Sequence, residues 1–216
     1  MRAPFADIAD TPTARSRSIL ALAIATAAFG AALYTRRTGN VWLGVGIASV
    51  CALGSALVLR ALPPFRVERR AIPAELALGA VLGLGMALLT HLLVPLALGL
   101  LPGAEAQVDA LYANLQHPPG PVAALPVLAL AVVAEEVVWR GVAIDVLGPN
   151  APRALFGAAL LYAIPQVLSG SWLLFVLALV CGVAWGLLRL WRGSLWAPMA
   201  THFAWNLVVF VFWPLT

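Results

Sequence analysis

Five polar residues in two otherwise apolar segments could perform acid–base chemistry inside a membrane. Glu135, Glu136 and Arg140 interrupt the run PVAALPVLALAVVAEEVVWRG, and His202 and Asn206 interrupt SLWAPMATHFAWNLVVF. An ionisable side chain near the middle of a bilayer is costly and persists where it is paired or used. We therefore expect each of these side chains either to have a polar partner or to take part in a reaction.

On a helix, the two glutamates of the first segment have different neighbours and are expected to have different roles. Glu136 and Arg140 lie one turn apart on the same face, with the acid before the base, which is the favourable order for an ion pair. Glu135 is turned by about 100° from Glu136 and cannot easily share this arginine. A carboxylate without a local partner can take up and release a proton, as a general base must.

His202 and Asn206 are four residues apart, so an imidazole and an amide share one helix face. Glu135 and His202 both fall roughly 5–10 Å from the predicted cytoplasmic ends of their segments, and this depth predicts a common site in the cytoplasmic half. Each group alone has a plainer interpretation. The acidic segment could be a charged cap at the membrane interface, and His202 with Asn206 could be hydrogen-bonding contacts between helices.

The elements that must position these residues are transmembrane helices. Of 216 residues, 62% are hydrophobic and 10% are charged, whereas soluble domains are about a quarter charged. Backbone in lipid must satisfy its own hydrogen bonds, which predicts an all-α, polytopic membrane helix bundle of about seven transmembrane helices. The predicted spans are Ser18–Tyr34, Val41–Leu59, Glu75–Leu101, Val122–Trp139, Ala154–Gln166, Trp172–Leu188 and Leu195–Trp213. The fifth is short and could bend or re-enter the membrane at Pro165.

Arginine placement predicts the orientation, because positively charged short loops stay in the cytoplasm. With the N-terminus inside and the C-terminus outside, all the arginines except Arg36 and Arg37 fall in cytoplasmic segments, including Arg2, Arg15, Arg17, Arg60, Arg66, Arg69, Arg70, Arg140, Arg153, Arg189 and Arg192. The outer segment Leu101–Pro121 contains acids and no arginine. We treat this segment as a loop.

The chain is predicted to be one membrane domain, residues 1–216, with a cytoplasmic segment at 1–17 and a motif-bearing core at 121–213. We interpret the first span as a retained anchor rather than a cleaved secretory signal, because a second span follows almost at once. All 13 basic residues are arginine. This usage favours a GC-rich bacterial genome and an inner (cytoplasmic) membrane location.

These motifs resemble the CPBP or Abi family of glutamate-dependent intramembrane proteases, which includes the type II CAAX prenyl endopeptidases and bacteriocin-processing or self-immunity proteins. The family is marked by Glu-Glu-x-x-x-Arg, an aromatic residue with histidine four residues later, and His-x-x-x-Asn. Here EEVVWR spans Glu135 to Arg140, and HFAWN spans His202 to Asn206. The resemblance implies that Glu135 activates water and that His202 and Asn206 stabilise the oxyanion of the tetrahedral intermediate.

The second motif departs from the family pattern. The segment LYAIPQVLSG has Tyr162 and Gln166 where the family has the aromatic residue and the histidine. Glutamine cannot exchange protons, so Glu135 would have to act as the sole base, or His202 would take over part of the proton transfer, with Gln166 holding the water by a hydrogen bond. His91 in the third span could replace the missing imidazole, or could be a structural histidine beside Pro95. His117 is interpreted as a loop residue.

The predicted function is an endopeptidase that cuts a membrane-associated or lipid-anchored protein near the cytoplasmic face. The alternative is a non-catalytic relative that acts as a membrane immunity, scaffolding or sorting factor. A small proton-coupled transporter is disfavoured because no inverted repeat is visible. The dispersed arginines argue against nucleic acid as a partner. We predict no cofactor and no metal, since the histidines lack HExxH spacing; the oligomeric state is left open.

Overall fold

The structure, a computed structural model, describes residues 11–36, 38–64 and 67–215. Within these ranges the chain forms helices and turns and no strand. The all-α fold class is therefore confirmed. Arg2, Arg37 and Arg66 lie outside the described residues, as do residues 1–10 of the predicted cytoplasmic segment.

The helices follow one another through short connections. Their bounds are α1 Pro12–Thr35, α2 Val41–Val58, η1 Arg69–Ala71, α3 Ile72–Leu100, α4 Ala104–Leu115, α5 Leu125–Glu135, η2 Glu136–Val142, α6 Ala143–Leu147, α7 Ala151–Val167, α8 Trp172–Arg192, α9 Trp196–Asn206 and η3 Leu207–Phe212. Polar caps start several of them, because a side-chain oxygen accepts a first-turn N–H that has no partner within the helix. Such caps precede α1, α2, α7 and α8, at Thr11, Asn40, Asn150 and Ser171.

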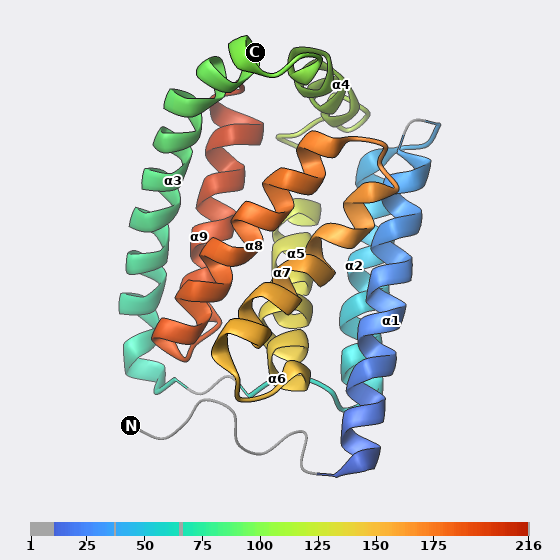
Figure 1. The fold of residues 1–216 in the computed structure, drawn as a ribbon, viewed down its shortest axis with the longest axis vertical. Coiled ribbons are helices and arrows are strands. Elements are labelled where there is room, and N and C mark those ends of the chain that lie inside the picture. Colours follow the sequence, from blue (N-terminus) through green and yellow to red (C-terminus); the bar gives the residue numbers. More distant parts are fainter. Residues whose placement is uncertain (1–10, 37, 65–66, 216) are drawn as a thin grey trace.

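The long helices run up and down between two ends of the bundle (Figure 1). One end holds the start of α1, the α2–α3 connection, α6 and the α8–α9 turn; we call it the arginine-rich end, because most of the arginines lie in or beside these segments. The other end holds the α1–α2 connection, α4 and the α7–α8 turn; we call it the α4 end. Successive predicted spans alternate in direction, as the sequence analysis expected.

Among the residues that the structure describes, four helices are long and apolar enough to cross a membrane: Pro12–Thr35, Val41–Val58, Arg69–Leu100 and Trp172–Arg192. The remaining predicted spans coincide with shorter helical stretches. One is α7, which has 17 residues, begins at Ala151 rather than Ala154, and continues through Pro165 to Val167. The helix is therefore unbroken at Pro165, and the re-entrant turn that was considered there is absent from these residues. Another is Trp196–Phe212, made of α9 and η3.

The predicted fourth span ends too early. Helical structure continues from α5 through the π-helix η2 into α6 and stops at Leu147, eight residues past the predicted end at Trp139. Valine, isoleucine and buried glycine continue the apolar character after Arg140, and the ion pair allows that arginine to lie inside the protein. Glu135 consequently lies near the middle of this helical stretch rather than close to the end that was predicted to be cytoplasmic.

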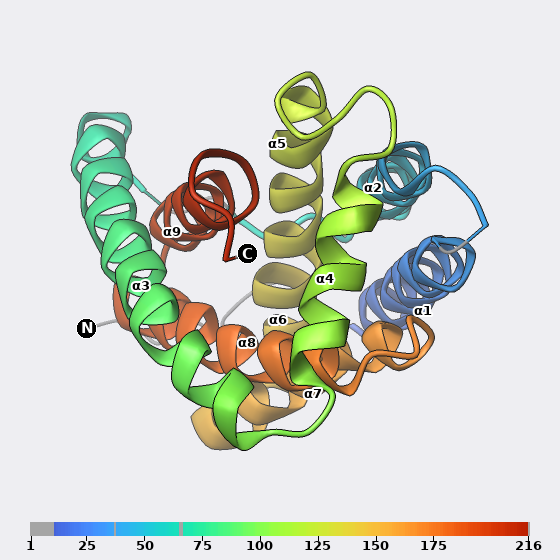
Figure 2. The same cartoon turned by 90° about the horizontal axis from the view of Figure 1, so that it is seen from above.

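The segment Leu101–Pro121 was predicted as a loop, and this was wrong. It contains α4, which lies across one end of the bundle (Figure 2) and contacts α2, α3 and the start of α8. Its buried residues Val108, Tyr112 and Leu115 recur at helical spacing. The Tyr112 hydroxyl donates to the Val209 carbonyl at 2.7 Å and accepts from the Leu215 N–H at 3.0 Å. Burial raises the pKa of Tyr112, so the hydroxyl keeps the proton that it donates.

Helix α3 stands at the edge of the bundle and lies along α9 (Figures 1 and 2). The contact surface on α3 is formed by small residues, Gly79, Gly83 and Ala87, which are buried. A Cβ atom added to Gly83 would meet the Thr201 carbonyl oxygen and would come within 2.8 Å of the Ala204 Cβ. This close approach, at the residue before His202, makes α3 the support of the helix that carries the imidazole.

Candidate active site

The first motif lies where an α-helix changes into a π-helix. Glu135 ends α5, and η2 begins at Glu136. A π-helical turn inside an α-helix alters which backbone groups pair and is frequent at functional sites. Here Arg189 of α8 donates its Nε to the Arg140 carbonyl at 3.3 Å. Gly141 lies against Pro63, whose ring would overlap a Cβ at that position. The motif backbone is therefore held by two distant segments.

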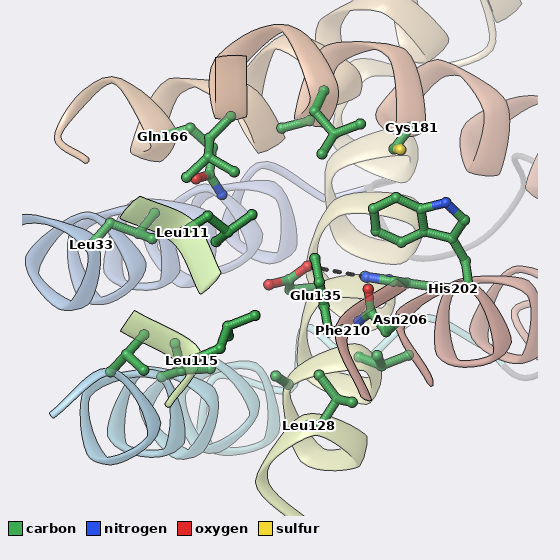
Figure 3. Close-up of a pocket in the computed structure, with 18 of the residues that line it drawn as sticks. Leu33, Leu111, Leu115, Leu128, Glu135, Gln166, Cys181, His202, Asn206 and Phe210 are labelled. Carbon is green, nitrogen blue, oxygen red and sulfur yellow. Dashed lines mark ion pairs between the residues drawn. The ribbon is translucent and has the colours of Figure 1, made fainter. Parts of the chain in front are cut away.

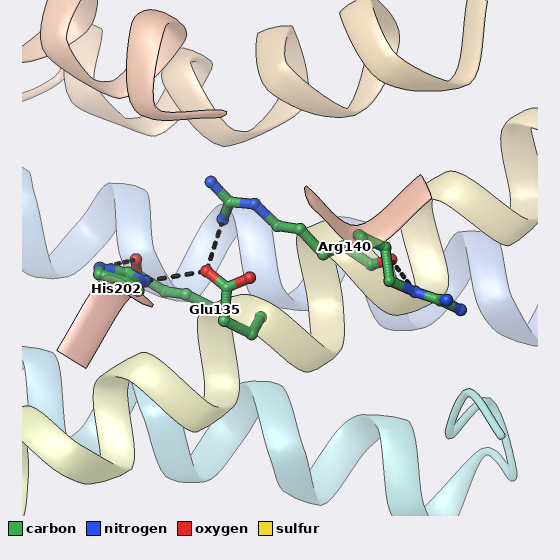
Figure 4. A network of polar contacts seen from close by, with 5 residues as sticks. Glu135, Arg140 and His202 are labelled. Carbon is green, nitrogen blue, oxygen red and sulfur yellow. Dashed lines mark hydrogen bonds and ion pairs between the residues drawn. The ribbon is translucent and has the colours of Figure 1, made fainter. Parts of the chain in front are cut away.

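Glu136 is fully buried and binds two cationic or polar partners through one oxygen. Its Oε1 is 2.9 Å from Nδ1 of His202 and 3.3 Å from Nη1 of Arg140. Figure 4 shows Arg140 and His202 in this network of polar contacts, together with Glu135. The ion pair with Arg140 is the one that the helical spacing predicted. The contact with His202 was not expected. An N–H at Nδ1 that donates to this carboxylate fixes the ring orientation and leaves Nε2 to face the other way.

Glu135 lies on the opposite side of the same imidazole. Its Oε2 is 3.9 Å from Nε2 of His202, and its side chain is 16% exposed. This separation is longer than a hydrogen bond. Figure 3 shows the Glu135 carboxylate and His202 approaching each other from α5 and α9 at a cavity. Glu136 thus faces Nδ1 in the protein interior, and Glu135 faces Nε2 from the side of the cavity.

A layer of aromatic rings surrounds the buried cation and the imidazole. The Arg140 guanidinium lies 4.2 Å from the Tyr162 ring centroid and 4.9 Å from that of Trp185. Trp185 also stacks on His202, with centroids 3.8 Å apart and planes inclined by 19°. Attraction between a cation and an aromatic face is strongest when water is excluded. Trp185 therefore connects the arginine of the first motif with the histidine of the third.

The cavity beside Glu135 has a volume of about 170 Å³ and is lined by residues of α1, α2, α4, α5, α7, α8 and α9. Asn206 lines it one helical turn from His202, and so do both second-motif residues, Tyr162 and Gln166. In Figure 3 the Gln166 amide projects into the cavity from α7. The structure therefore brings Glu135, His202 and Asn206 to one cavity together with the residues of the divergent second motif, while Glu136 and Arg140 lie behind it.

His91 does not line this cavity. Its Nδ1 is 2.8 Å from the Ala87 carbonyl oxygen and its Nε2 is 2.8 Å from that of Trp213, on whose ring it stacks. Both ring nitrogens are thus engaged by backbone, and the idea that His91 replaces the missing imidazole is not supported by its position. His117 lies in the connection between α4 and α5, in agreement with its interpretation as a loop residue.

The cavity extends from Glu135 toward the α4 end. Its lining includes Leu111, Asn114 and Leu115 of α4 and Arg36 at the end of α1. The site was predicted to lie in the cytoplasmic half, which the arginines assign to the arginine-rich end. The cavity instead lies on the other side of Glu135 from Arg140, because Arg140 is packed between buried rings and closes that direction.

No group of three histidine, cysteine, aspartate or glutamate side chains is placed to hold a metal ion in the part of the chain that the structure describes. The polar side chains at the cavity include a carboxylate, an imidazole, amides, a phenol, a thiol and a guanidinium. Such groups can accept a proton from water and donate hydrogen bonds to a carbonyl oxygen that becomes negatively charged. This is the chemistry of amide hydrolysis.

Residues 118–208 match the model of a family described as type II CAAX prenyl endopeptidase Rce1-like. This segment is Rce1-like. This match confirms the predicted resemblance to the CPBP and CAAX protease family. The family is one of proteases, which implies a protein substrate and a membrane setting. No curated protein and no solved structure matched the chain. The family and the apolar helices together identify an integral membrane protein.

The Rce1-like segment begins before α5 and ends in η3, so it contains all three motifs. Motif reasoning missed Trp185 and Arg189, which lie on α8 between the second and third motifs. The signal that could have indicated them is their spacing: they are four residues apart in WGLLR, so a tryptophan and an arginine share one face of an apolar helix. The buried positions of both side chains are consistent with that face pointing at the motifs.

Proposed function

We propose that the chain is an intramembrane endopeptidase in which Glu135 is the general base for an attacking water. The observation that supports this most is the pair of carboxylates around His202. Glu136 binds Nδ1 in the interior, and Glu135 approaches Nε2 from the cavity. A base and a hydrogen-bond donor then flank one point where a scissile carbonyl could lie.

In the proposed reaction, Glu135 takes a proton from water while the water oxygen bonds to the carbonyl carbon. The carbonyl oxygen becomes an oxyanion, which accepts hydrogen bonds from His202 and the Asn206 amide. In the doubly protonated ring, Nδ1–H donates to Glu136 and Nε2–H remains for the oxyanion. The proton on Glu135 passes to the leaving nitrogen as the C–N bond breaks. Gln166 can orient the water but cannot carry its proton.

The substrate in this proposal is a membrane-associated or lipid-anchored protein, and residues 121–213 form the catalytic core. The lipid-facing helices and the Rce1-like family support a substrate that reaches the cavity from the membrane. A cavity lined mainly by apolar side chains favours an apolar, unfolded stretch of the substrate chain. The location we propose is the cytoplasmic membrane of a bacterium.

The test compares protein termini in membranes that contain the wild type or Glu135→Gln at equal levels. Loss of a general base lowers the rate by about 10²- to 10⁴-fold, so we expect a cleaved terminus that the wild type produces to disappear in the variant. Glu68→Gln is the matched control, because the Glu68 side chain is 69% exposed and remote from the motifs. Identical termini in all three samples would contradict proteolysis by Glu135.

A second function is favoured by one observation, the amide of Gln166 at the place where the resemblance implies a histidine. The alternative is a family member without catalysis that binds a membrane protein as an immunity, scaffolding or sorting factor. This alternative predicts that deleting the gene for the chain changes the phenotype of the cell, whereas Glu135→Gln leaves the phenotype unchanged. The same comparison of termini, with a deletion strain added, separates the two functions.

A further inference from the structure

The ring of Tyr162 on α7 is fixed by side chains of η2 and α8. Its centroid lies 4.2 Å from the Arg140 guanidinium, and the Trp139 and Trp185 rings are tilted against it with centroids 6.4 and 6.2 Å away. A Cβ atom added to Gly182 of α8 would contact its Cδ1 at 3.4 Å. The residue is buried. Because the ring is packed on several sides, the position of its hydroxyl group is set by the surrounding core.

This hydroxyl group lies beside the carboxylate of Glu135. It is close enough to that carboxylate to act as a hydrogen-bond donor, and both side chains line the cavity. A phenol keeps its proton near neutral pH, so it can donate to an ionised carboxylate. Nε2 of His202 is 3.9 Å from Oε2 of Glu135, which is too long for a hydrogen bond. Tyr162 therefore offers Glu135 a donor that His202 does not.

The hydroxyl group of Tyr162 also supplies something that the ring alone cannot. The family resemblance implies an aromatic residue at this position, and a phenylalanine ring would serve for the contacts with Arg140 and Trp185. One turn later on the same face of α7, Gln166 stands where the resemblance implies a histidine. The second motif thus lacks one polar partner for Glu135 and contains another that the family pattern does not require.

We infer that Tyr162 is a positioning residue for Glu135: its hydroxyl group donates to one carboxylate oxygen and leaves the other to take the proton of the attacking water. A glutamate that faces a cavity has several rotamers, whereas one bound to a fixed donor keeps a single orientation. The hydrogen bond is strongest while Glu135 is ionised, which is the form that acts as a base. The charges of His202, Arg140 and Glu136 also face Glu135. This inference rests on the proposed function, since it gives Tyr162 a part in that reaction.

The first measurement detects the hydrogen bond without a substrate. The whole protein is purified in detergent with a carbon-13 label on the tyrosine ring carbon that bears the hydroxyl group, so its three tyrosines give three NMR signals. Tyr162→Phe identifies the signal of Tyr162. We expect Glu135→Gln to shift this signal and to leave those of Tyr34 and Tyr112 in place, because a neutral amide accepts a weaker hydrogen bond than a carboxylate. Glu68→Gln, at a side chain that is 69% exposed, is the matched control and should shift none of the three.

The second measurement compares rates on an internally quenched peptide that spans the cleaved bond found in the comparison of termini. Tyr162→Phe keeps the ring beside Arg140 and removes only the hydroxyl group. We expect kcat to fall by about tenfold to a hundredfold with an unchanged KM, because a reacting group displaced by about 1 Å loses rate on this order. Tyr34→Phe is the matched control, since Tyr34 is exposed.

Two results would overturn the inference. One is a Tyr162 signal that Glu135→Gln leaves unchanged. The other is a Tyr162→Phe protein that cuts the peptide with the kcat of Tyr34→Phe, whatever its KM. A wild type that cuts no protein would contradict the proposed function alone, because the NMR signal still decides whether Tyr162 holds Glu135.

Discussion

The side chains around His202 show how a buried polar site can be both stable and reactive. Glu136 is enclosed, and its Oε1 is contacted by His202 and Arg140. Removing one member of such a buried cluster leaves an uncompensated charge, so it costs more than losing an exposed ion pair. Glu135 has no such enclosure and faces the cavity. We interpret Glu136 as the residue that orients the imidazole and Glu135 as the one that reacts.

At the same scale, Trp185 should matter for activity although it belongs to none of the motifs. Trp185→Leu removes the ring that stacks on His202 and faces Arg140. We expect kcat to fall by about tenfold to a hundredfold, because stacking and cation–aromatic attraction both orient these groups. Trp185→Phe should keep part of the rate. Trp191→Leu, at a side chain that is 65% exposed, is the control; equal rates for Trp185→Leu and this control would contradict the role.

Gln166 allows a test of the divergent second motif. Gln166→His places an imidazole at the cavity where a proton carrier is absent. Histidine has an ordinary pKa of about 6.5, so we expect a faster reaction with a new inflection in the pH–rate profile between roughly pH 5 and 8. Gln116→His, at an exposed position after α4, provides the comparison. A rate and profile unchanged by Gln166→His would mean that Glu135 needs no second group there.

At the scale of elements, the contact between α3 and α9 determines how firmly the imidazole is held. Gly83→Ala forces the added methyl group against the Thr201 carbonyl and the Ala204 Cβ. Overpacking of this kind costs about 1–3 kcal/mol, and we expect a lower unfolding temperature and reduced cleavage. Gly85→Ala is the matched control, because nothing lies within 4 Å of its added Cβ and alanine favours the helix. Equal unfolding temperatures of the Gly83→Ala and Gly85→Ala proteins in the same detergent would contradict this role of the contact between α3 and α9.

The helices that could be predicted from the sequence are those whose signal is hydropathy alone. Long apolar stretches locate α1, α2, α3 and α8 to within six residues at each end, and motif spacing predicts the ion pair of Glu136 with Arg140. Helix α4 was missed because a search for spans passes over a short segment with acids, although Val108, Tyr112 and Leu115 share one face. The π-helix and the contact of Trp185 with His202 depend on tertiary packing, which no local pattern of residues specifies.

For the whole molecule, the alternation of helices makes the orientation testable. Arg69 and Gln116 are exposed and lie at opposite ends of the bundle. We replace each by cysteine in a chain that lacks Cys51 and Cys181. With the arginine-rich end in the cytoplasm, a membrane-impermeant maleimide added to intact cells with a permeable outer layer should label Gln116→Cys and not Arg69→Cys. Labelling of Arg69→Cys alone would reverse the orientation.

The length of α3 has a consequence for the lipid that surrounds the protein. Its 29 residues span about 43 Å, whereas the hydrocarbon core of a typical bilayer is about 30 Å thick. A helix that exceeds the core tilts, and the angle depends on bilayer thickness. Because α3 touches α9 through glycines, with only backbone and alanine methyl groups at the contact, a change of tilt is passed directly to the helix that carries His202. Acyl chain length should therefore tune the geometry of the site without any ligand.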